Sequence, residues 1–203
     1  MLKKTPQQER SRAVVDCILG AATRILGTRA LRDTTTNHIA ALAGVGIGSL
    51  YQYFQSKEAI VECLLEHHRV DSLALADGVL RGEAGSVAGR YRTMMRELLA
   101  LHERDRILHL NFLALETSGA PSDHLPEVRR HLELVAQLLR EEQPQMDRVS
   151  ALLHAQVMMR SVHTLVHCTI QLPEPEREHI ALEHYDAFVP DYCRFTSAAA
   201  RPH

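Results

Sequence analysis

The 203-residue sequence has few cysteines and no long apolar segment, and each of these shortages excludes a class of protein. Four cysteines lie far apart, at positions 17, 63, 168 and 193, without the spacing of a zinc finger or a redox pair. We therefore expect reduced thiols. No run of eighteen apolar residues occurs, and the first eight residues lack the apolar segment of a secretion signal. These absences predict a cytoplasmic protein without a membrane partner.

Charge is distributed unevenly along the chain. The net charge is −2, yet residues 1–57 contain eight lysines or arginines against three acids. Residues 58–203 contain 15 basic and 22 acidic residues. A basic end joined to an acidic body is typical of a protein that meets a polyanion with one end only.

Residues 34–54, TTTNHIAALAGVGIGSLYQYF, predict two short helices joined by a glycine turn. Ile39 and Ala43 are four positions apart and share one helix face. Gly44 can end the first helix because glycine adopts a positive φ without steric cost. Val45 and Leu50 can both point into the angle between the helices. The pattern is that of a helix-turn-helix.

The polar residues of this segment suit contact with DNA. No Asp or Glu occurs from Thr34 to Lys57, and Thr35 or Thr36 can cap the first helix. The free amides of that helix end can hold a phosphate oxygen. Three of the nine aromatic residues fall between Tyr51 and Phe54. We expect Phe54 in the core and both tyrosines on the surface.

The stretch TTTNHIAALAGVGIGSLYQYFQSKEAI resembles the DNA-binding signature of the tetracycline-repressor (TetR) family of bacterial regulators. The resemblance also takes in the preceding helix from Arg10 to Leu26, whereas the rest of the chain matches only in length and helical character. The resemblance implies phosphate contacts from Thr36, Ser49, Tyr53 and Lys57, and base or groove contacts from Asn37, Ile47, Gly48, Tyr51 and Gln52. Each residue also has an ordinary alternative, as a cap, an amphipathic surface ring or a solvated charge.

The sequence departs from the family pattern at two positions. The family often has serine at the position of Gly46 and a polar or basic residue at that of Ile47. Because an apolar side chain cannot donate a hydrogen bond to guanine, we hypothesise that Ile47 contacts a thymine methyl group.

Apolar periodicity predicts an all-α fold. With the family resemblance, this implies an N-terminal three-helix DNA-binding domain with a helix-turn-helix, then a C-terminal helical ligand-binding and dimerisation domain. The predicted domains are residues 10–56, with the start of a connecting helix at 57–77, and residues 78–203. The expected helices after Ser56 are Lys57–Asp77, Tyr91–Glu103, Ile107–Glu116, Glu127–Gln143, Asp147–Ile170 and Glu176–Thr196. A glycine-containing break spans Gly78–Gly89, a loop spans Thr117–Pro126, and Pro190 should kink or restart the last helix.

The last two helices are the predicted site of self-association. The segment Asp147–Ile170 lacks Gly and Pro and is apolar nearly all round, so more than one neighbour must bury it. Two copies of the pair would form the intermolecular four-helix bundle that the family resemblance implies. The alternative is a helix at the centre of a monomeric core.

The body has residues suited to a small-molecule pocket. Ten of the thirteen histidines lie beyond residue 100, among methionines and leucines, and such apolar walls with a few polar groups are typical of ligand sites. The predicted lining residues are Met94, His109, Phe112, His131 and Met159, with ordinary core packing as the alternative. His163 and His167 could chelate a metal from one helix face, but interface packing explains them better, and we predict no metal site, cofactor or catalytic residue.

Together these features predict a ligand-responsive repressor that binds a palindromic DNA operator as a homodimer and is released by a small-molecule effector. One alternative is a helical enzyme in which His109 with Glu116, or Glu183 with His184, performs acid-base chemistry. Another is a DNA-binding module without an effector.

Overall fold

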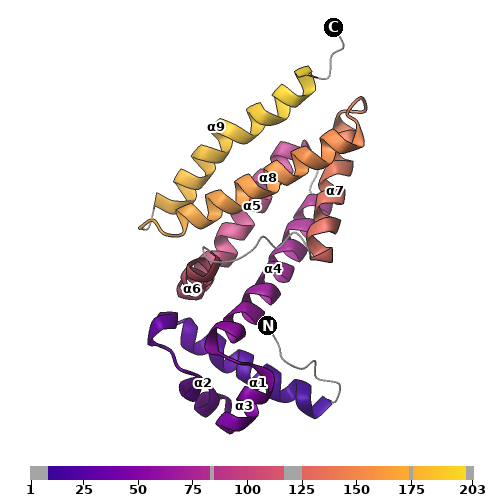
Figure 1. Cartoon of the computed structure of the whole chain (residues 1–203). Coiled ribbons are helices and arrows are strands. Elements are labelled where there is room, and N and C mark those ends of the chain that lie inside the picture. Colours follow the sequence, from indigo (N-terminus) through magenta and orange to yellow (C-terminus); the bar gives the residue numbers. More distant parts are fainter. Residues whose placement is uncertain (1–8, 83–84, 117–124, 174–175, 200–203) are drawn as a thin grey trace. The chain divides into compact units, whose positions relative to one another are not determined.

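The computed structural model describes residues 9–82, 85–116, 125–173 and 176–199 (Figure 1). Throughout these ranges the secondary structure is helical, which confirms the predicted all-α fold. The predicted loop Thr117–Pro126 lies outside the described residues except for its last two positions. No helix in the described ranges is long and apolar enough to cross a membrane.

The chain divides into two compact units with separate cores. The first unit comprises residues 1–69 and 105–120, and the second comprises residues 70–104 and 121–203. The helix Ile107–Glu116, which the sequence analysis assigned to the body, thus packs with the amino-terminal residues. Its packing partners are far away in the chain, so periodicity alone could not indicate them.

Among its described residues, the first unit is built from five helices and one 3-10 turn. These are α1 (Glu9–Leu26), η1 (Leu31–Asp33), α2 (Thr36–Ala43), α3 (Ile47–Tyr53), the first part of α4 (Lys57–Gly82) and α6 (Arg106–Glu116). Ile18, Leu50 and Phe54 are completely buried in its core, to which α6 adds Leu108 and Phe112. Phe54 therefore lies in the core as predicted.

The second unit contains the later part of α4 with α5 (Val87–Arg104), α7 (Pro126–Glu142), α8 (Arg148–Thr169) and α9 (Glu176–Ala199). Its core is built around Leu80, Tyr91, Met158 and Tyr185. The Tyr185 hydroxyl donates a hydrogen bond to the Ala88 carbonyl oxygen at 2.6 Å, which joins α9 to α5. Helices α8 and α9 lie side by side (Figure 1).

The predicted end of α4 at Asp77 is wrong, and of the two effects expected of Pro190 the restart does not occur, while the kink stays a prediction. Helix α4 continues through Gly78 to Gly82, because the buried Leu80 anchors the last turns and outweighs the roughly 0.5–1 kcal/mol that a glycine costs in a helix. Helix α9 continues through Pro190 and does not restart there. The buried Tyr185 and Val189 hold the turn before this proline against the core.

Side chains cap three helices, as predicted for Thr35 and Ser56. Thr35 accepts a hydrogen bond from the His38 amide at 3.2 Å, and Ser56 accepts one from the Ala59 amide at 3.2 Å. Asp147 accepts from the amides of Val149 and Ser150 at 2.9 and 3.0 Å. Each cap satisfies amides that the first turn of a helix leaves unpaired.

Candidate nucleic-acid interface

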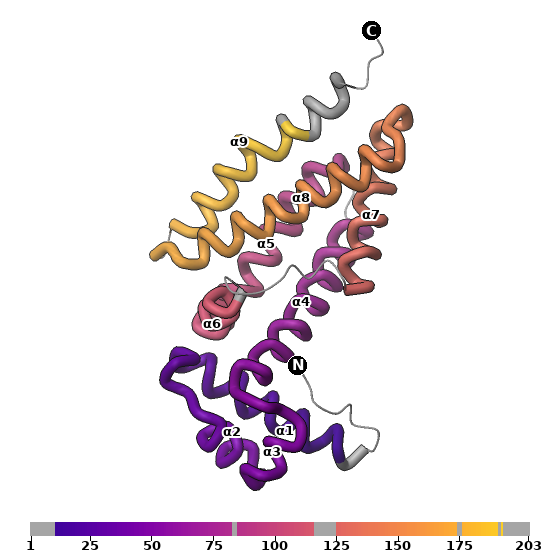
Figure 2. Tube along the Cα trace, in the orientation of Figure 1, coloured from indigo at the N-terminus to yellow at the C-terminus, as the bar shows by residue number. Residues whose placement is uncertain are grey.

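Figure 2 follows the Cα trace of α2 and α3 in the amino-terminal part of the chain. The turn between these helices depends on one left-handed glycine. Gly44 has φ 68° and ψ 27°, and its amide donates to the carbonyl oxygens of Ala40 and Ala41. The next amide, of Val45, donates to Ala40 at 3.1 Å. These bonds close the carboxyl end of α2 and direct the chain into α3, which confirms the predicted helix-turn-helix.

Helix α3 buries one side and exposes the other. Leu50 is completely buried, whereas Ile47 and Tyr51 are 38% and 44% exposed. Gly48 and Gln52 are also exposed. Because the pairs 47/51 and 48/52 are each four positions apart, these four residues share one face, which we call the α3 outer face. It contains no acidic side chain.

A contact between the helices joins two of the predicted DNA-binding residues. The hydroxyl groups of Thr36 and Tyr51 lie 3.0 Å apart, at the start of α2 and in the middle of α3. Asn37, the next residue of α2, is exposed. Hydroxyl and amide groups from both helices thus gather beside the free amides of the first turn of α2.

Ser49 and Tyr53, which are predicted to contact phosphate, are less exposed than the residues of the α3 outer face. Both are half-buried, and Tyr53 packs against the core of the first unit. The expectation that both tyrosines lie fully on the surface therefore holds for Tyr51 and only partly for Tyr53. Phosphate contacts from Ser49 and Tyr53 stay predictions.

Lys57 has a structural role that the sequence did not reveal. Its ammonium group donates to the carbonyl oxygens of Leu31 and Thr34, at 2.8 and 2.9 Å. Two of its three N–H groups therefore bind the segment between α1 and α2, which we call the connector (residues 27–35). One N–H remains for the predicted phosphate contact.

Asn111 holds the same connector from α6, and sequence reasoning missed it. Its side-chain oxygen accepts from the Leu31 amide at 2.8 Å, and its NH₂ group donates to Leu26 and Arg29 at 2.9 and 3.0 Å. Asn111 is buried, so these bonds are shielded from water. No local pattern announces such a residue, because its partners are at least 80 positions away.

The five predicted effector-binding residues fall in different units. His109 and Phe112 lie on α6 in the first unit, whereas Met94, His131 and Met159 belong to the second. Met94 and His131 are buried in the second core, and His131 contacts the Asp77 carboxylate through Nδ1 at 2.7 Å. The structure therefore gives no single unit that contains all five, and their role stays a prediction.

A pocket of about 530 Å³ opens elsewhere on the second unit. None of the predicted effector residues lines it. Its walls are Arg81, Arg129, Arg130, Glu133, Leu134, Ala136, Gln137, Arg140 and Arg148. Arg148 pairs with Glu133 across it at 2.5 Å, and Arg130 pairs with Glu127 at 3.0 Å. The remaining arginines make this a strongly basic depression.

Part of the first unit is similar to known bacterial regulatory proteins. Residues 18–64 match the family model described as bacterial regulatory proteins, tetR family. Over 65 residues the chain is 43% identical to the HTH-type transcriptional repressor KstR2 of Mycolicibacterium smegmatis (strain ATCC 700084 / mc(2)155), a match that covers 32% of this chain and 31% of that repressor. The chain thus matches less than a third of its curated relative.

Solved structures resemble a much larger share of the chain. A TetR-family transcriptional regulator from Pectobacterium atrosepticum has a TM-score of 0.69 at 17% identity, over 91% of this chain and 94% of that one. A structure described as a SmeT-triclosan complex has a TM-score of 0.56 at 17% identity, over 86% and 90%. At such identities the likeness concerns the fold.

Proposed function

We propose that this chain, whose residues 18–64 match the TetR family model of bacterial regulatory proteins, represses transcription as an operator-binding homodimer that a small molecule releases from DNA. This family consists of transcriptional regulators and not of enzymes. The alternative of a helical enzyme with His109 and Glu116, or Glu183 and His184, is therefore set aside.

The observation that carries the proposal is the α3 outer face. Tyr51 provides a hydroxyl group, Gln52 an amide group and Ile47 an apolar side chain. Gly48 has no side chain, and no acidic group is present to repel phosphate. Tyr51 and Gln52 can donate to base edges, and Gly48 lets the DNA approach the helix closely. Thr36 and Lys57 would bind the flanking phosphates, and Asn37 would contact a base or the groove.

Dimerisation supplies the second reading helix. Val149 and Leu153 of α8 are 78% and 58% exposed and are four positions apart, and Phe188 of α9 is 53% exposed. Phe188 also stacks on Tyr192, with ring centroids 6.0 Å apart. Such large apolar side chains on two adjacent helices favour a second copy of the same pair as their partner.

Operator binding is tested with the purified chain and DNA fragments selected from a random pool. We expect an inverted repeat whose half-sites lie roughly 34–36 Å apart, one turn of DNA. Gln52→Ala should relax the preference at one base position, while Tyr53→Phe should weaken binding to all sequences alike. Log affinity should fall by about 0.9 per log unit of salt for each phosphate neutralised. An affinity independent of salt would contradict this electrostatic account.

The dimer is tested by light scattering after gel filtration. Leu153→Glu should convert the chain to a monomer, since it places a charge in the proposed interface. Leu42→Glu is the matched control, because Leu42 is 48% exposed on α2, which belongs to the other unit. A wild-type chain that elutes as a monomer would exclude the proposed bundle.

The effector is proposed to bind the second unit, where buried polar groups lie within an apolar core. His131 is 1% exposed and is paired with Asp77, as expected of a polar group that orients a ligand. A coupling of about 1–3 kcal/mol would change operator occupancy 5- to 150-fold. A compound library screened by operator release tests this, with His131→Leu expected to lose the response. Release by no compound favours the module without an effector.

A further inference from the structure

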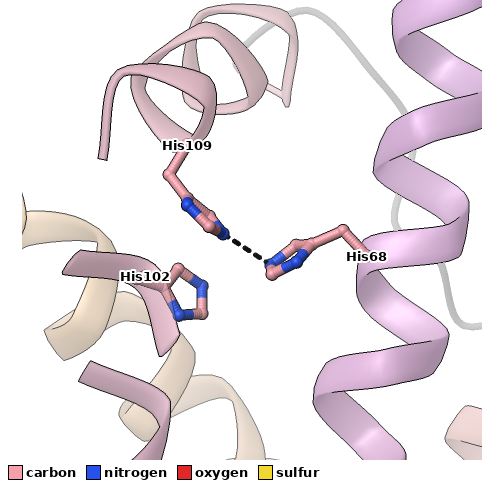
Figure 3. Close-up of side chains that lie close together, drawn as sticks. All are labelled: His68, His102 and His109. Atoms are coloured by element: carbon pink, nitrogen blue, oxygen red, sulfur yellow. Dashed lines mark hydrogen bonds between the residues drawn. The ribbon is translucent and has the colours of Figure 1, made fainter. Parts of the chain in front are cut away.

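We propose that the first unit binds a divalent transition-metal ion through His68 and His109. His68 lies on α4 and His109 on α6, 41 positions apart in the chain, and their Nε2 atoms are 3.1 Å apart (Figure 3). The spacing of histidines in the sequence gave no indication of this pair. The proposal does not depend on the proposed function, because it concerns the first unit alone.

The tautomer of His109 is fixed by its backbone. Its Nδ1 lies 3.0 Å from the Asp105 carbonyl oxygen, and a carbonyl oxygen only accepts hydrogen bonds. Nδ1 must therefore carry the hydrogen, which leaves the lone pair of the neutral ring on Nε2, directed at His68. In a metal-bound histidine, the ring nitrogen that does not bind the metal usually donates a hydrogen bond to such a carbonyl oxygen, to a carboxylate or to water.

The separation of the two nitrogens suits a metal ion. Two imidazole nitrogens bound to one tetrahedral Zn²⁺ at about 2.0–2.1 Å lie roughly 3.3–3.4 Å apart. The observed 3.1 Å is within a few tenths of an ångström of that value. Binding requires the neutral His68 ring to change tautomer, with its hydrogen on Nδ1 instead of Nε2, so that both Nε2 lone pairs face the ion.

The surroundings hold the rings in place. Phe112, which is buried, lies 5.5 Å from the His68 ring and 5.7 Å from the His109 ring, measured between centroids. The two imidazoles are themselves 4.3 Å apart with an interplanar angle of 76°. Because one ring is nearly perpendicular to the other, both Nε2 atoms can point at a common centre.

Imidazole ligands select zinc, copper, nickel and cobalt over magnesium and calcium. The ion would join α4 to α6, and Asn111 joins α6 to the connector, so the metal should stabilise the first unit. Binding should weaken as the pH falls below about 6.5, since protonated imidazole cannot ligate.

The test is equilibrium dialysis of the full chain, stripped with a chelator, against Zn²⁺. We expect one ion per chain for the wild type, and at least about 100-fold weaker binding for His68→Gln and for His109→Gln, because the loss of an outer-shell partner alone costs 10- to 100-fold. His163→Gln is the matched control. Its ring lies 3.9 Å from that of His167 on α8, at a four-residue spacing that would allow chelation but that we attribute to packing, and the substitution should leave binding unchanged.

Two further measurements guard against variants that fail to fold. Circular dichroism should give the same helix content for all three variants, and Co²⁺ should give a visible absorption band with the wild type and with His163→Gln only. Zinc uptake that survives in folded His68→Gln or His109→Gln overturns the proposal. So does the absence of uptake by the wild type at neutral pH.

Discussion

The two units of this chain differ in how their structure is encoded. In the first, the turn at Gly44, the cap at Thr35 and the buried Leu50 all lie within about twenty residues, and the local pattern determines the motif. In the second, Leu80, Tyr91, Met158 and Tyr185 meet from four helices spread over a hundred positions. The match to the family model accordingly covers residues 18–64 of the first unit, whereas the likeness of the second unit to solved structures concerns only the fold.

The largest expected effects come from substitutions that destabilise one core at a time. Phe54→Ala should destabilise the first unit by about 3–5 kcal/mol, and Met158→Ala the second by about 2–5 kcal/mol. Both side chains are nearly completely buried. Hydrogen exchange should accelerate in α1–α3 for the first variant and in α8 for the second. Equal acceleration of both units in both variants would show that they unfold as one.

The hydrogen bonds between Asn111 and the chain around the connector test how much α6 contributes to the stability of the first unit. Asn111→Ala removes three hydrogen bonds and should cost about 3 kcal/mol, at roughly 1 kcal/mol for each bond. Asn37→Ala, at an exposed position of α2, is the control and should stay within about 0.5 kcal/mol. Urea unfolding measures both. A silent Asn111→Ala would mean that water replaces the lost bonds.

Two glycines distinguish structural from functional requirements within the helix-turn-helix. A Cβ atom at Gly44 or Gly48 would meet nothing within 4 Å, so space is not the difference between them. Gly44→Ala should destabilise the chain by about 1–2 kcal/mol, the cost of a left-handed residue with a side chain. Gly48→Ala should stabilise the helix by roughly 0.5–1 kcal/mol.

Operator affinity should change in the opposite sense to stability at Gly48. The added methyl group lies on the α3 outer face and would keep the DNA at a distance. Thermal unfolding and a binding titration on the same samples compare the two glycines. Unchanged affinity of Gly48→Ala would remove this residue from the interface.

The smallest effect concerns pH and the second unit. His154 lies 2.6 Å from the Tyr192 hydroxyl, and partial burial lowers its pKa below the ordinary imidazole value. The neutral ring is thus favoured in the folded state. Its stabilising contribution is present above the ordinary pKa and is lost as the pH falls through the lowered one.

Urea midpoints at about pH 7.5 and about pH 5.5 measure this contribution. The difference between them should shrink in His154→Gln, which cannot titrate. If the wild type and the variant lose the same stability on acidification, the pH response arises elsewhere in the chain.

Sequence reasoning succeeded where the determining contacts are local. It placed the caps at Thr35 and Ser56, the turn at Gly44 and the all-α fold, because each depends on neighbours within one or two turns. It misplaced the end of α4, because Leu80 is buried by distant helices. It missed Asn111 and the pair His68–His109, whose partners are brought together only by the fold.

The lysine at the start of α4 has a practical consequence. Lys57 is the one lysine among the residues that the structure describes, and its ammonium group is bound by two carbonyl oxygens. An amine-directed acylating reagent can modify it only when the connector opens. The rate at which Lys57 is acylated, measured by mass spectrometry of the peptide that contains it, therefore reports how often the connector opens.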